Sequence, residues 1–226
     1  MNKEKLKIHE NLISVEGIDG AGKSTFIKSF KEYFKSEKVE ILRYDTAPFD
    51  EDATTYIRAM LSSTEKEIDT DTKNKSLLYA FISDFIIHEN NISKFVSETL
   101  FSNAGMVVSD RYLLSTIAYQ SLNIPFEEVC DIIKKSNLKF PKYIIYLDCN
   151  PEIAIKRISA RNEEKEIFEK LDTLKQVYEN YKKGLEWISR NSDAKIIRLD
   201  ASIDLSNYPD YVKRIAEIID EKNLYN

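Results

Sequence analysis

The sequence of 226 residues predicts an α/β fold, with a five-stranded parallel sheet between two layers of helices. Short apolar runs of strand length alternate with longer segments in which apolar residues recur at helical spacing, which is typical of a parallel sheet covered by helices. The run at 143–147, Tyr-Ile-Ile-Tyr-Leu, is almost wholly apolar and suits a central strand buried on both faces. Because no repeat or low-complexity linker marks a boundary, we expect a single domain over residues 1–226.

The first half of the chain begins with an apolar strand at 12–15, followed by a helix at 24–36 that places four apolar side chains on one side. A second strand is expected at 39–44, and a helix at 53–61 carries Tyr56, Ile57 and Met60. A long helical pattern covers 75–101, with Asn90-Asn91 as a kink or break. The third strand is expected at 106–109.

The second half continues with a helix at 126–135, entered through Pro125, because proline suits the start of a helix. The strand at 143–147 is bounded by Pro141 and Pro151, and helices at 153–160 and 171–189 follow, separated by a densely charged stretch. A last strand at 195–199 and a closing helix at 211–221 complete the pattern.

Composition excludes several classes of protein. The 33 Lys and Arg against 38 Asp and Glu leave a formal charge of −5, which repels a polyanion, so we expect no nucleic acid polymer as a partner. Cys130 and Cys149 lack metal-ligand spacing and are expected to be core residues. No signal-like segment and no run of 18 apolar residues occurs, so we expect a cytoplasmic protein without a membrane partner.

The segment Gly17-Ile-Asp-Gly-Ala-Gly-Lys-Ser24 fits the phosphate-binding P-loop pattern between a strand and a helix. Its glycines let backbone N–H groups point at phosphate oxygens, Lys23 can reach the β- and γ-phosphates, and Ser24 can bind Mg²⁺. We therefore predict a three-layer α/β/α P-loop NTPase fold that binds ATP and Mg²⁺. The predicted ATP-binding residues are Gly17, Asp19, Gly20, Ala21, Gly22, Lys23, Ser24 and Thr25. The alternative is a glycine-rich turn that only links a strand to a helix.

A second candidate group, Asp110-Arg111-Tyr112, follows the third strand at the edge of the sheet where ligands bind in open α/β folds. Asp110 could hold a Mg²⁺-bound water or orient the acceptor, and Arg111 could bridge two phosphates bidentately. A surface ion pair at a strand end is the alternative reading.

Together with Leu113-Leu114-Ser115-Thr116-Ile117-Ala118-Tyr119-Gln120, this segment resembles the thymidylate kinases, which have Asp-Arg-Tyr, Ser-Ser and Tyr-Gln at this place. The resemblance extends from Glu16–Thr25 to 177–185 and includes Tyr146-Leu147-Asp148. It implies a homodimer and a short lid at about 161–168, led by Arg157 and Arg161. Because Gly20 stands where some relatives carry an arginine, we expect these two arginines to supply positive charge to the transition state. A solvated charged helix face is the alternative.

The resemblance fails on the acceptor side. The family's Arg-Glu-Pro-Gly-Gly motif reads Thr46-Ala47-Pro48-Phe49-Asp50 here, so its arginine and glutamate are absent. Asp45, Asp50 or Glu51 could replace the carboxylate. In the family an aromatic residue stacks on thymine, and an arginine four positions later hydrogen-bonds the base. This sequence keeps the aromatic residue as Tyr79 and has Ser83 in place of the arginine.

The residues expected at the acceptor are Arg58, Tyr79, Ser83, Arg111, Ser115, Thr116, Tyr119 and Gln120. The alternative for Tyr79 is an ordinary aromatic residue of the core. The alternative for Gln120 is a solvated glutamine at the end of a helix. The resemblance implies a nucleoside monophosphate kinase that transfers the γ-phosphoryl group of ATP to a deoxynucleoside monophosphate, with Lys23, Asp110, Arg111, Arg157 and Arg161 in catalysis. The acceptor that the resemblance favours is dTMP; the changes at Ala47 and Ser83 mean that either the base is read differently or the acceptor is another monophosphate. A deoxynucleoside kinase and an ATP-binding relative with altered catalysis are the competing hypotheses.

Overall fold

The structure is a computed structural model that describes residues 5–36, 40–45, 57, 59–60, 69–99, 105–160, 171–203 and 205–223. Its strands pair in parallel in the order β2-β3-β1-β4-β5. They are β1 (Ile8–Glu16), β2 (Glu40–Asp45), β3 (Gly105–Asp110), β4 (Phe140–Asp148) and β5 (Lys195–Asp200). The α/β class with a parallel sheet is confirmed, and β1, which leads into the P-loop, lies between β3 and β4.

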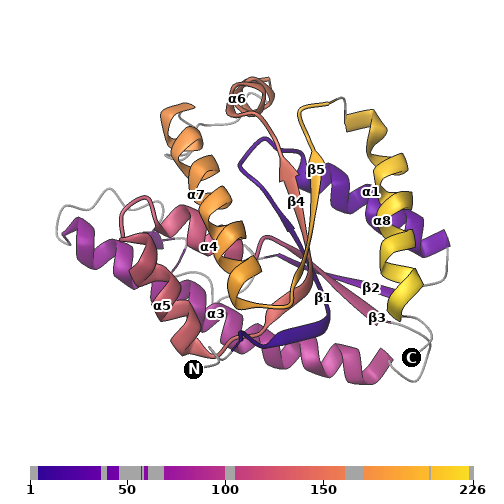
Figure 1. Ribbon diagram of the computed structural model, residues 1–226, viewed down its shortest axis with the longest axis horizontal. Coiled ribbons are helices and arrows are strands. Elements are labelled where there is room, and N and C mark those ends of the chain that lie inside the picture. The colour runs from indigo at the N-terminus through magenta and orange to yellow at the C-terminus, as the bar shows by residue number, and fades with distance from the viewer. Residues whose placement is uncertain are drawn as a thin grey trace.

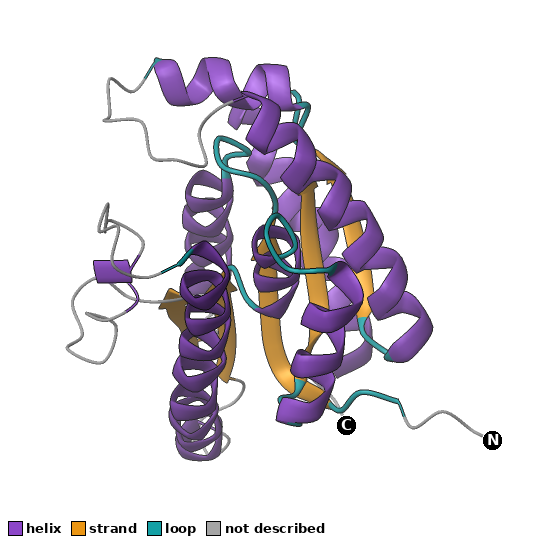
Figure 2. Cartoon of the chain, turned by 90° about the vertical axis from the view of Figure 1, so that its left-hand side faces the viewer, coloured by secondary structure: helices purple, strands orange, loops and turns teal. Residues whose placement is uncertain are grey.

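Helices cover both faces of this sheet. They are α1 (Lys23–Ser36), α3 (Thr70–Thr99), α4 (Leu113–Gln120), α5 (Phe126–Ser136), α6 (Pro151–Ser159), α7 (Leu171–Asn191) and α8 (Tyr208–Asn223), with a 3-10 turn η4 (Leu205–Asn207). Figure 1 shows α1 and α8 together on one face, and α4, α5 and α7 on the other. In the side view of Figure 2, α3 stands as one long helix beside these layers. In the described part of the chain, no helix is both long and apolar enough to span a membrane.

Helix α1 packs as its sequence predicts. Phe26, Ile27, Phe30 and Phe34 are fully buried, which accounts for the spacing of apolar residues along the helix. The ring of Phe26 meets that of Tyr208 edge to face, with centroids 5.5 Å apart. This contact fixes α8 beside the helix that begins in the P-loop.

The helix α3 runs through Asn90 and Asn91 without interruption, so the predicted break is wrong. Both asparagines face solvent, where an unfavourable helix propensity costs only about 0.5 kcal/mol, while Ile92 beside them is buried. Packing of the buried stripe therefore outweighs the local preference.

Helix α4 was not predicted from the sequence. All of its residues except Tyr119 are buried, so it lacks the alternation of apolar and polar faces that reveals a surface helix. Of the predicted helix at 53–61, Ile57, Ala59 and Met60 are helical; the remainder lies outside the described residues. The predicted lid at 161–168 also lies outside them.

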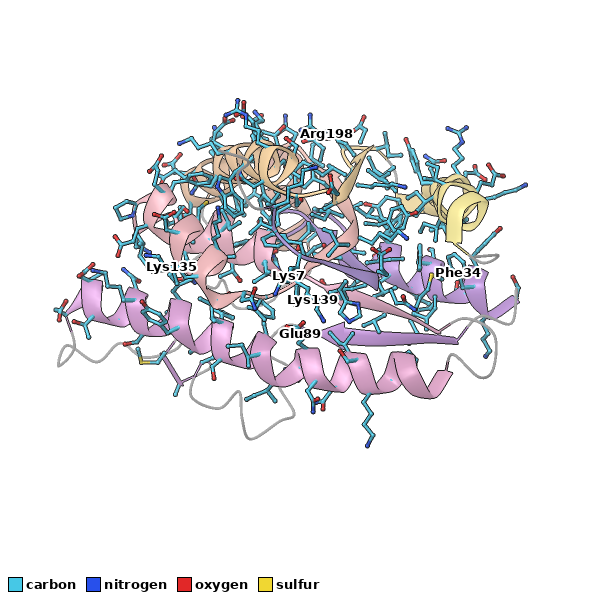
Figure 3. All side chains as sticks on the ribbon, turned by 60° about the horizontal axis from the view of Figure 1, so that its bottom comes forward. Lys7, Phe34, Glu89, Lys135, Lys139 and Arg198 are labelled. Carbon is cyan, nitrogen blue, oxygen red and sulfur yellow. The ribbon has the colours of Figure 1, made fainter. Side chains whose placement is uncertain are left out.

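Strand β4 extends past the predicted boundary at Pro141. This proline pairs with His9, and the next pairing on β4 joins Tyr143 to Ile13, so the register shifts where the proline cannot donate a hydrogen bond. At the same edge of the sheet, Lys139 forms an ion pair of 3.1 Å with Glu89 of α3, and Figure 3 shows the two side chains close together. The P-loop lies at the other end of the strands.

Candidate active site

The P-loop backbone is shaped by glycines in the left-handed region. Gly17, Gly20 and Gly22 have φ values of 147°, 78° and 91°. A Cβ atom on Gly17 would lie 2.8 Å from the carbonyl oxygen of Leu147, and one on Gly20 would lie 2.4 Å from that of Ala154. The loop thus packs directly against β4 and α6, and a side chain at position 20, including the arginine of some relatives, does not fit this arrangement.

Lys23 is buried beneath the loop. Its Nζ donates hydrogen bonds to the carbonyl oxygens of Gly17 at 3.1 Å and Ile18 at 3.0 Å. Burial, followed by the nearby Arg111 guanidinium, lowers the pKa of Lys23 to about 8. Asp19, Asp110 and Glu16 act in the opposite direction but do not outweigh burial, and phosphate oxygens would supply further negative charge to this ammonium group.

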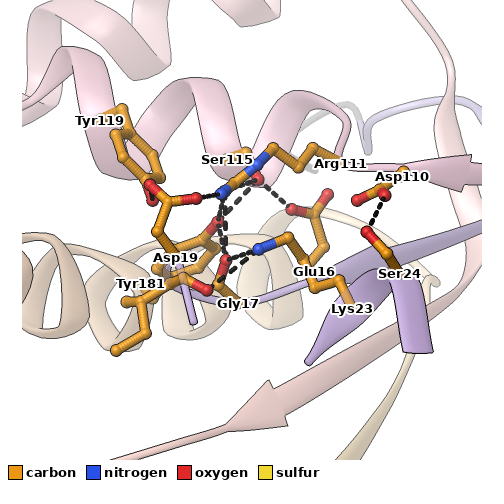
Figure 4. A network of polar contacts seen from close by, with 11 residues as sticks. Glu16, Gly17, Asp19, Lys23, Ser24, Asp110, Arg111, Ser115, Tyr119 and Tyr181 are labelled. Atoms are coloured by element: carbon orange, nitrogen blue, oxygen red, sulfur yellow. Dashed lines mark hydrogen bonds and ion pairs between the residues drawn. The ribbon is translucent and has the colours of Figure 1, made fainter. Parts of the chain in front are cut away.

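Ser24 and Asp110 present oxygen atoms to each other where α1 begins and β3 ends. The Ser24 hydroxyl donates to Oδ2 of Asp110 at 3.3 Å, and Ser24 faces solvent (Figure 4). A hydroxyl and a carboxylate are the hard oxygen ligands that Mg²⁺ accepts alongside water and substrate phosphates. This pair could therefore hold a Mg²⁺ ion, as the sequence predicts. Thr25, in the same helical turn, is also exposed.

Arg111 connects the P-loop to α4 and α7. Its backbone adopts a left-handed conformation with φ of 71°, and its NH1 donates to the carbonyl of Gly17 at 3.1 Å and to the hydroxyl of Tyr181 at 3.2 Å. Its NH2 forms an ion pair with Asp19, and the guanidinium lies over the Tyr119 ring, 4.9 Å from the centroid. These contacts fix a positive charge at the edge of the phosphate loop.

Asp19 joins the loop to the helix that carries the predicted acceptor residues. Its second carboxylate oxygen accepts a hydrogen bond of 2.8 Å from the Tyr119 hydroxyl. Burial by itself would raise the pKa of Asp19, but Arg111 and Lys23 outweigh it and hold the pKa below its usual value. Asp19 is therefore ionised at neutral pH.

Glu16, the residue before the P-loop, has no exposed surface. One carboxylate oxygen accepts a hydrogen bond from Ser115, whose hydroxyl also lies 2.6 Å from that of Tyr181. Burial raises the pKa of Glu16 to about 7, against the opposing influence of Ser115 and Arg111. Figure 4 shows Glu16 and Ser115 next to Arg111, in one network with Gly17 and Lys23.

Arg157, predicted to supply charge to the transition state, is engaged with backbone carbonyls. Its guanidinium donates to Ala201 at 2.8 Å, to Ile203 at 2.7 Å and, at 3.5 Å, to Gly20 of the P-loop. In this arrangement Arg157 ties α6 to the P-loop and to the segment after β5. Arg161 lies outside the described residues.

The predicted acceptor residues fall into two groups. Ser115, Thr116, Tyr119 and Gln120 lie together on α4 beside Arg111, and Gln120 is 7% exposed, so it is not a solvated helix end. Tyr79 and Ser83 lie one turn apart on α3 and are exposed, with Tyr79 57% exposed. Tyr79 lines a surface hollow with Thr72, Lys75, Ser76 and Ala80 of the same helix. Arg58 lies outside the described residues.

Sequence reasoning assigned no role to three residues that hold this site. Glu16 could have been recognised from the sequence, because a carboxylate at the end of an apolar strand is expected to be buried and to need hydrogen-bond partners. Tyr181 and Tyr208 carry no such signal in the sequence, because their spacing on α7 and α8 is that of ordinary core residues. Yet the Tyr181 hydroxyl donates to Gly17 at 3.1 Å and that of Tyr208 to Ala21 at 2.9 Å.

Comparison with known proteins agrees with this geometry. The family model described as thymidylate kinase matches residues 15–207. A thymidylate kinase of Leptospira borgpetersenii is 35% identical over 183 residues, which cover 80% of this chain and 84% of that protein. A probable thymidylate kinase of Sulfolobus acidocaldarius is 34% identical, with 85% and 90% covered, and one of Methanosarcina barkeri is 30% identical, with 90% and 92% covered. The chain belongs to the thymidylate kinase family.

Proposed function

We propose that this protein is a nucleoside monophosphate kinase that transfers the γ-phosphoryl group of ATP to dTMP with the help of Mg²⁺. The observation that carries the proposal is the convergence of Lys23, Asp19 and Arg111 on the Gly17 end of the P-loop, with Ser24 and Asp110 beside it. Membership of a family whose members are named thymidylate kinase supports the choice of acceptor.

The chemistry requires positioning and neutralisation of charge more than covalent help from the protein. An oxygen of the acceptor phosphate forms a bond to the γ-phosphorus as the bond from that phosphorus to the β–γ bridging oxygen breaks. Ser24 and Asp110 would hold Mg²⁺, which neutralises charge on the phosphate oxygens when bound. Lys23 would bind the β- and γ-phosphates, and Arg111 lies where it could contact the transferred group.

The absence of the family's Arg-Glu pair at Thr46 and Ala47 bears on the choice between acceptors. A phosphate monoester is already largely ionised near neutral pH, since its second pKa is about 6, so it attacks without a general base. A nucleoside 5′-hydroxyl must lose a proton and needs a carboxylate base. Among the described residues the carboxylates beside the P-loop are Asp19, Asp110 and Glu16, and each accepts a hydrogen bond from a residue of the site. A monophosphate acceptor is therefore compatible with the loss of that glutamate, and the names of the related proteins support its choice over a nucleoside.

A panel of acceptors tests the proposal. We expect ADP release from ATP–Mg²⁺ to be stimulated by dTMP, less by dUMP and other monophosphates, and not by thymidine, and to be lost in Lys23→Ala. Stimulation by thymidine instead would identify a deoxynucleoside kinase. If none of these acceptors stimulates turnover in the wild type, the ATP-binding relative with altered catalysis becomes the correct reading.

We also propose that the protein is a cytoplasmic homodimer that associates through α3. Ile86 and Ile87 are adjacent on this helix and are 53% and 50% exposed, which is unusual for such large apolar residues. Light scattering after size exclusion should give the mass of a dimer for the wild type and of a monomer for Ile86→Lys with Ile87→Lys. A monomeric wild type would contradict this assembly.

A further inference from the structure

Glu16 occupies a position that packing alone does not explain. It is the last residue of β1, it has no exposed surface, and Oε1 has no hydrogen-bond partner among the described residues. Burying a carboxylate costs several kcal/mol unless other groups compensate for the lost hydration. The compensation here comes from groups that hold the P-loop and Arg111, which suggests that the carboxylate acts on them in return.

A chain of hydrogen bonds leads from Glu16 to the phosphate loop. Ser115 donates to Glu16, the Ser115 and Tyr181 hydroxyls are 2.6 Å apart, and Tyr181 reaches the Gly17 carbonyl at 3.1 Å. NH1 of Arg111 lies within 3.4 Å of Ser115, 3.2 Å of Tyr181 and 3.1 Å of Gly17. The oxygens of Ser115, Tyr181 and Gly17 therefore belong to this chain of hydrogen bonds and also lie within hydrogen-bond reach of Arg111.

Counting hydroxyl protons shows how Glu16 affects Arg111. When Glu16 is ionised, Ser115 gives its only hydroxyl proton to the carboxylate, and the single hydroxyl proton of Tyr181 goes to either Ser115 or Gly17. The chain of hydroxyls then places one hydrogen bond on the three oxygens that Arg111 contacts. When Glu16 is protonated, its proton can go to Ser115, Ser115 then donates to Tyr181, and Tyr181 donates to Gly17. In that order all three oxygens accept a hydrogen bond from the chain of hydroxyls, two more than when Glu16 is ionised, so fewer of their lone pairs remain for Arg111.

We propose that Glu16 is a positioning residue for phosphoryl transfer, whose ionised carboxylate turns Ser115 toward itself and so leaves the oxygens of Ser115 and Tyr181 to hold Arg111 beside Gly17. This inference rests on the proposed kinase function, and it adds a residue that does not itself touch a substrate. The carboxylate acts from below the loop, through α4 and α7.

Other groups around Glu16 also carry or change charge. They are Lys23 on α1, Arg111 after β3, Asp19 in the P-loop, Tyr181 on α7 and Tyr146 on β4, with the hydroxyls of Ser14 on β1 and Ser115 on α4. The pKa values of Glu16 and Lys23 are both moved toward neutrality, to about 7 and about 8. A substitution at Glu16 is therefore needed to separate the two.

The test compares kcat and KM against pH for the wild type, Glu16→Gln and Glu16→Ala, with ATP–Mg²⁺ and dTMP each varied up to saturation. Wild-type kcat should rise between about pH 6 and 8 as Glu16 ionises. In Glu16→Gln the amide oxygen accepts from Ser115 at every pH, so this variant should keep most of the maximal kcat and lose the rise. Glu16→Ala should lower kcat about tenfold or more at every pH, with KM nearly unchanged.

Asp84→Asn is the matched control, because Asp84 is also a buried carboxylate but lies on α3, where it is paired with His88. The kcat–pH profile of this variant should follow that of the wild type. A Glu16→Gln variant that keeps the wild-type pH dependence, or a Glu16→Ala variant with wild-type kcat, would overturn the proposal.

A spectroscopic measurement keeps the inference separate from the choice of acceptor. The side-chain Nε–Hε NMR signal of Arg111, assigned by its absence in Arg111→Lys, should move with pH in the wild type and stay constant in Glu16→Gln. If dTMP is not phosphorylated but this signal behaves as described, the proposed function fails and the role of Glu16 stands. A signal with the same pH dependence in both proteins would reject that role.

Discussion

The hydroxyl of Tyr181 donates a hydrogen bond of 3.1 Å to the carbonyl oxygen of Gly17, across 164 positions of sequence. On the other face of the sheet, the Tyr208 hydroxyl reaches Ala21 of the same loop at 2.9 Å. Figure 1 places α7 and α8, which carry these tyrosines, on opposite sides of the strands. The phosphate loop is thus held from both layers of helices by hydroxyl groups that bind its backbone carbonyls.

Removing these two hydroxyls should have different effects on activity. Tyr181→Phe and Tyr208→Phe should each lower the free energy of unfolding by about 1 kcal/mol, the usual contribution of one hydrogen bond. Because Tyr181 also contacts Ser115 and Arg111, its loss should lower kcat by about threefold to tenfold, whereas Tyr208→Phe should leave kcat within about twofold. Urea unfolding and steady-state kinetics measure both, with Tyr211→Phe on α8 as control. Equal effects on kcat would contradict the special position of Tyr181.

Glycine at position 20 should resist substitution more than glycine at position 184. Gly20→Ala must adopt a φ of 78° and place its Cβ 2.4 Å from a backbone oxygen of α6, so we expect a loss of stability of about 2–4 kcal/mol and weak ATP binding. At Gly184 the added Cβ would lie 2.7 Å from the end of the Leu114 side chain, which can turn away, and alanine favours the helix. Thermal unfolding and fluorescent-nucleotide binding compare the two; a Gly184→Ala variant as damaged as Gly20→Ala would contradict this reading.

The two arginines of the lid sequence should separate into different kinetic classes. Arg157 binds three backbone carbonyls, so Arg157→Ala should lower the melting temperature and raise KM for ATP by loosening the loop at Gly20. Arg161→Ala should lower kcat much more than ATP affinity if that guanidinium acts on the transition state. ATP titrations and kcat for both variants decide the matter. A pure loss of binding with unchanged kcat in Arg161→Ala would reject its catalytic role.

The charge of Glu16 should also appear in stability. Its pKa is raised from 4.5 to about 7 in the folded protein, so the folded state binds more protons than the unfolded state between these values. The contribution of Glu16 to the free energy of unfolding is therefore fully present below about pH 4.5 and is lost as the pH rises toward 7. The loss is about 1.4 kcal/mol per pH unit, or about 3 kcal/mol in total. Urea unfolding at several pH values should show this fall in the wild type and a flatter curve in Glu16→Gln. Parallel curves would place the pKa of Glu16 near its ordinary value.

Much of the donor side could be predicted because it depends on local sequence. The P-loop pattern predicts which backbone groups and side chains would contact a phosphate, and this stays a prediction. Ser24 and Asp110 meet because the neighbouring parallel strands β1 and β3 end at the same side of the sheet. Helix α4 could not be predicted, because a helix that is buried on nearly all sides shows no alternation of apolar and polar residues at helical spacing. Pro141 was misjudged because a shift of register lets a proline stand inside a strand.

The support beneath the loop could not be predicted, because it joins residues far apart in sequence. Glu16, Ser115 and Tyr181 come from β1, α4 and α7, and no spacing in the sequence relates them. For Arg157 the family resemblance implies a charge that acts on the transition state. In the structure its guanidinium donates hydrogen bonds to backbone carbonyls instead. Which atoms a long side chain reaches depends on tertiary packing.

The most direct test of the proposed function is to follow the labelled γ-phosphoryl group of ATP. With ATP–Mg²⁺ and dTMP, the wild type should transfer the label to a product that co-migrates with dTDP, and Lys23→Ala, folded to the same extent, should transfer none above background. Label released only as inorganic phosphate, or transferred to thymidine in preference to dTMP, would contradict the assignment of this protein as a kinase of thymidine monophosphate.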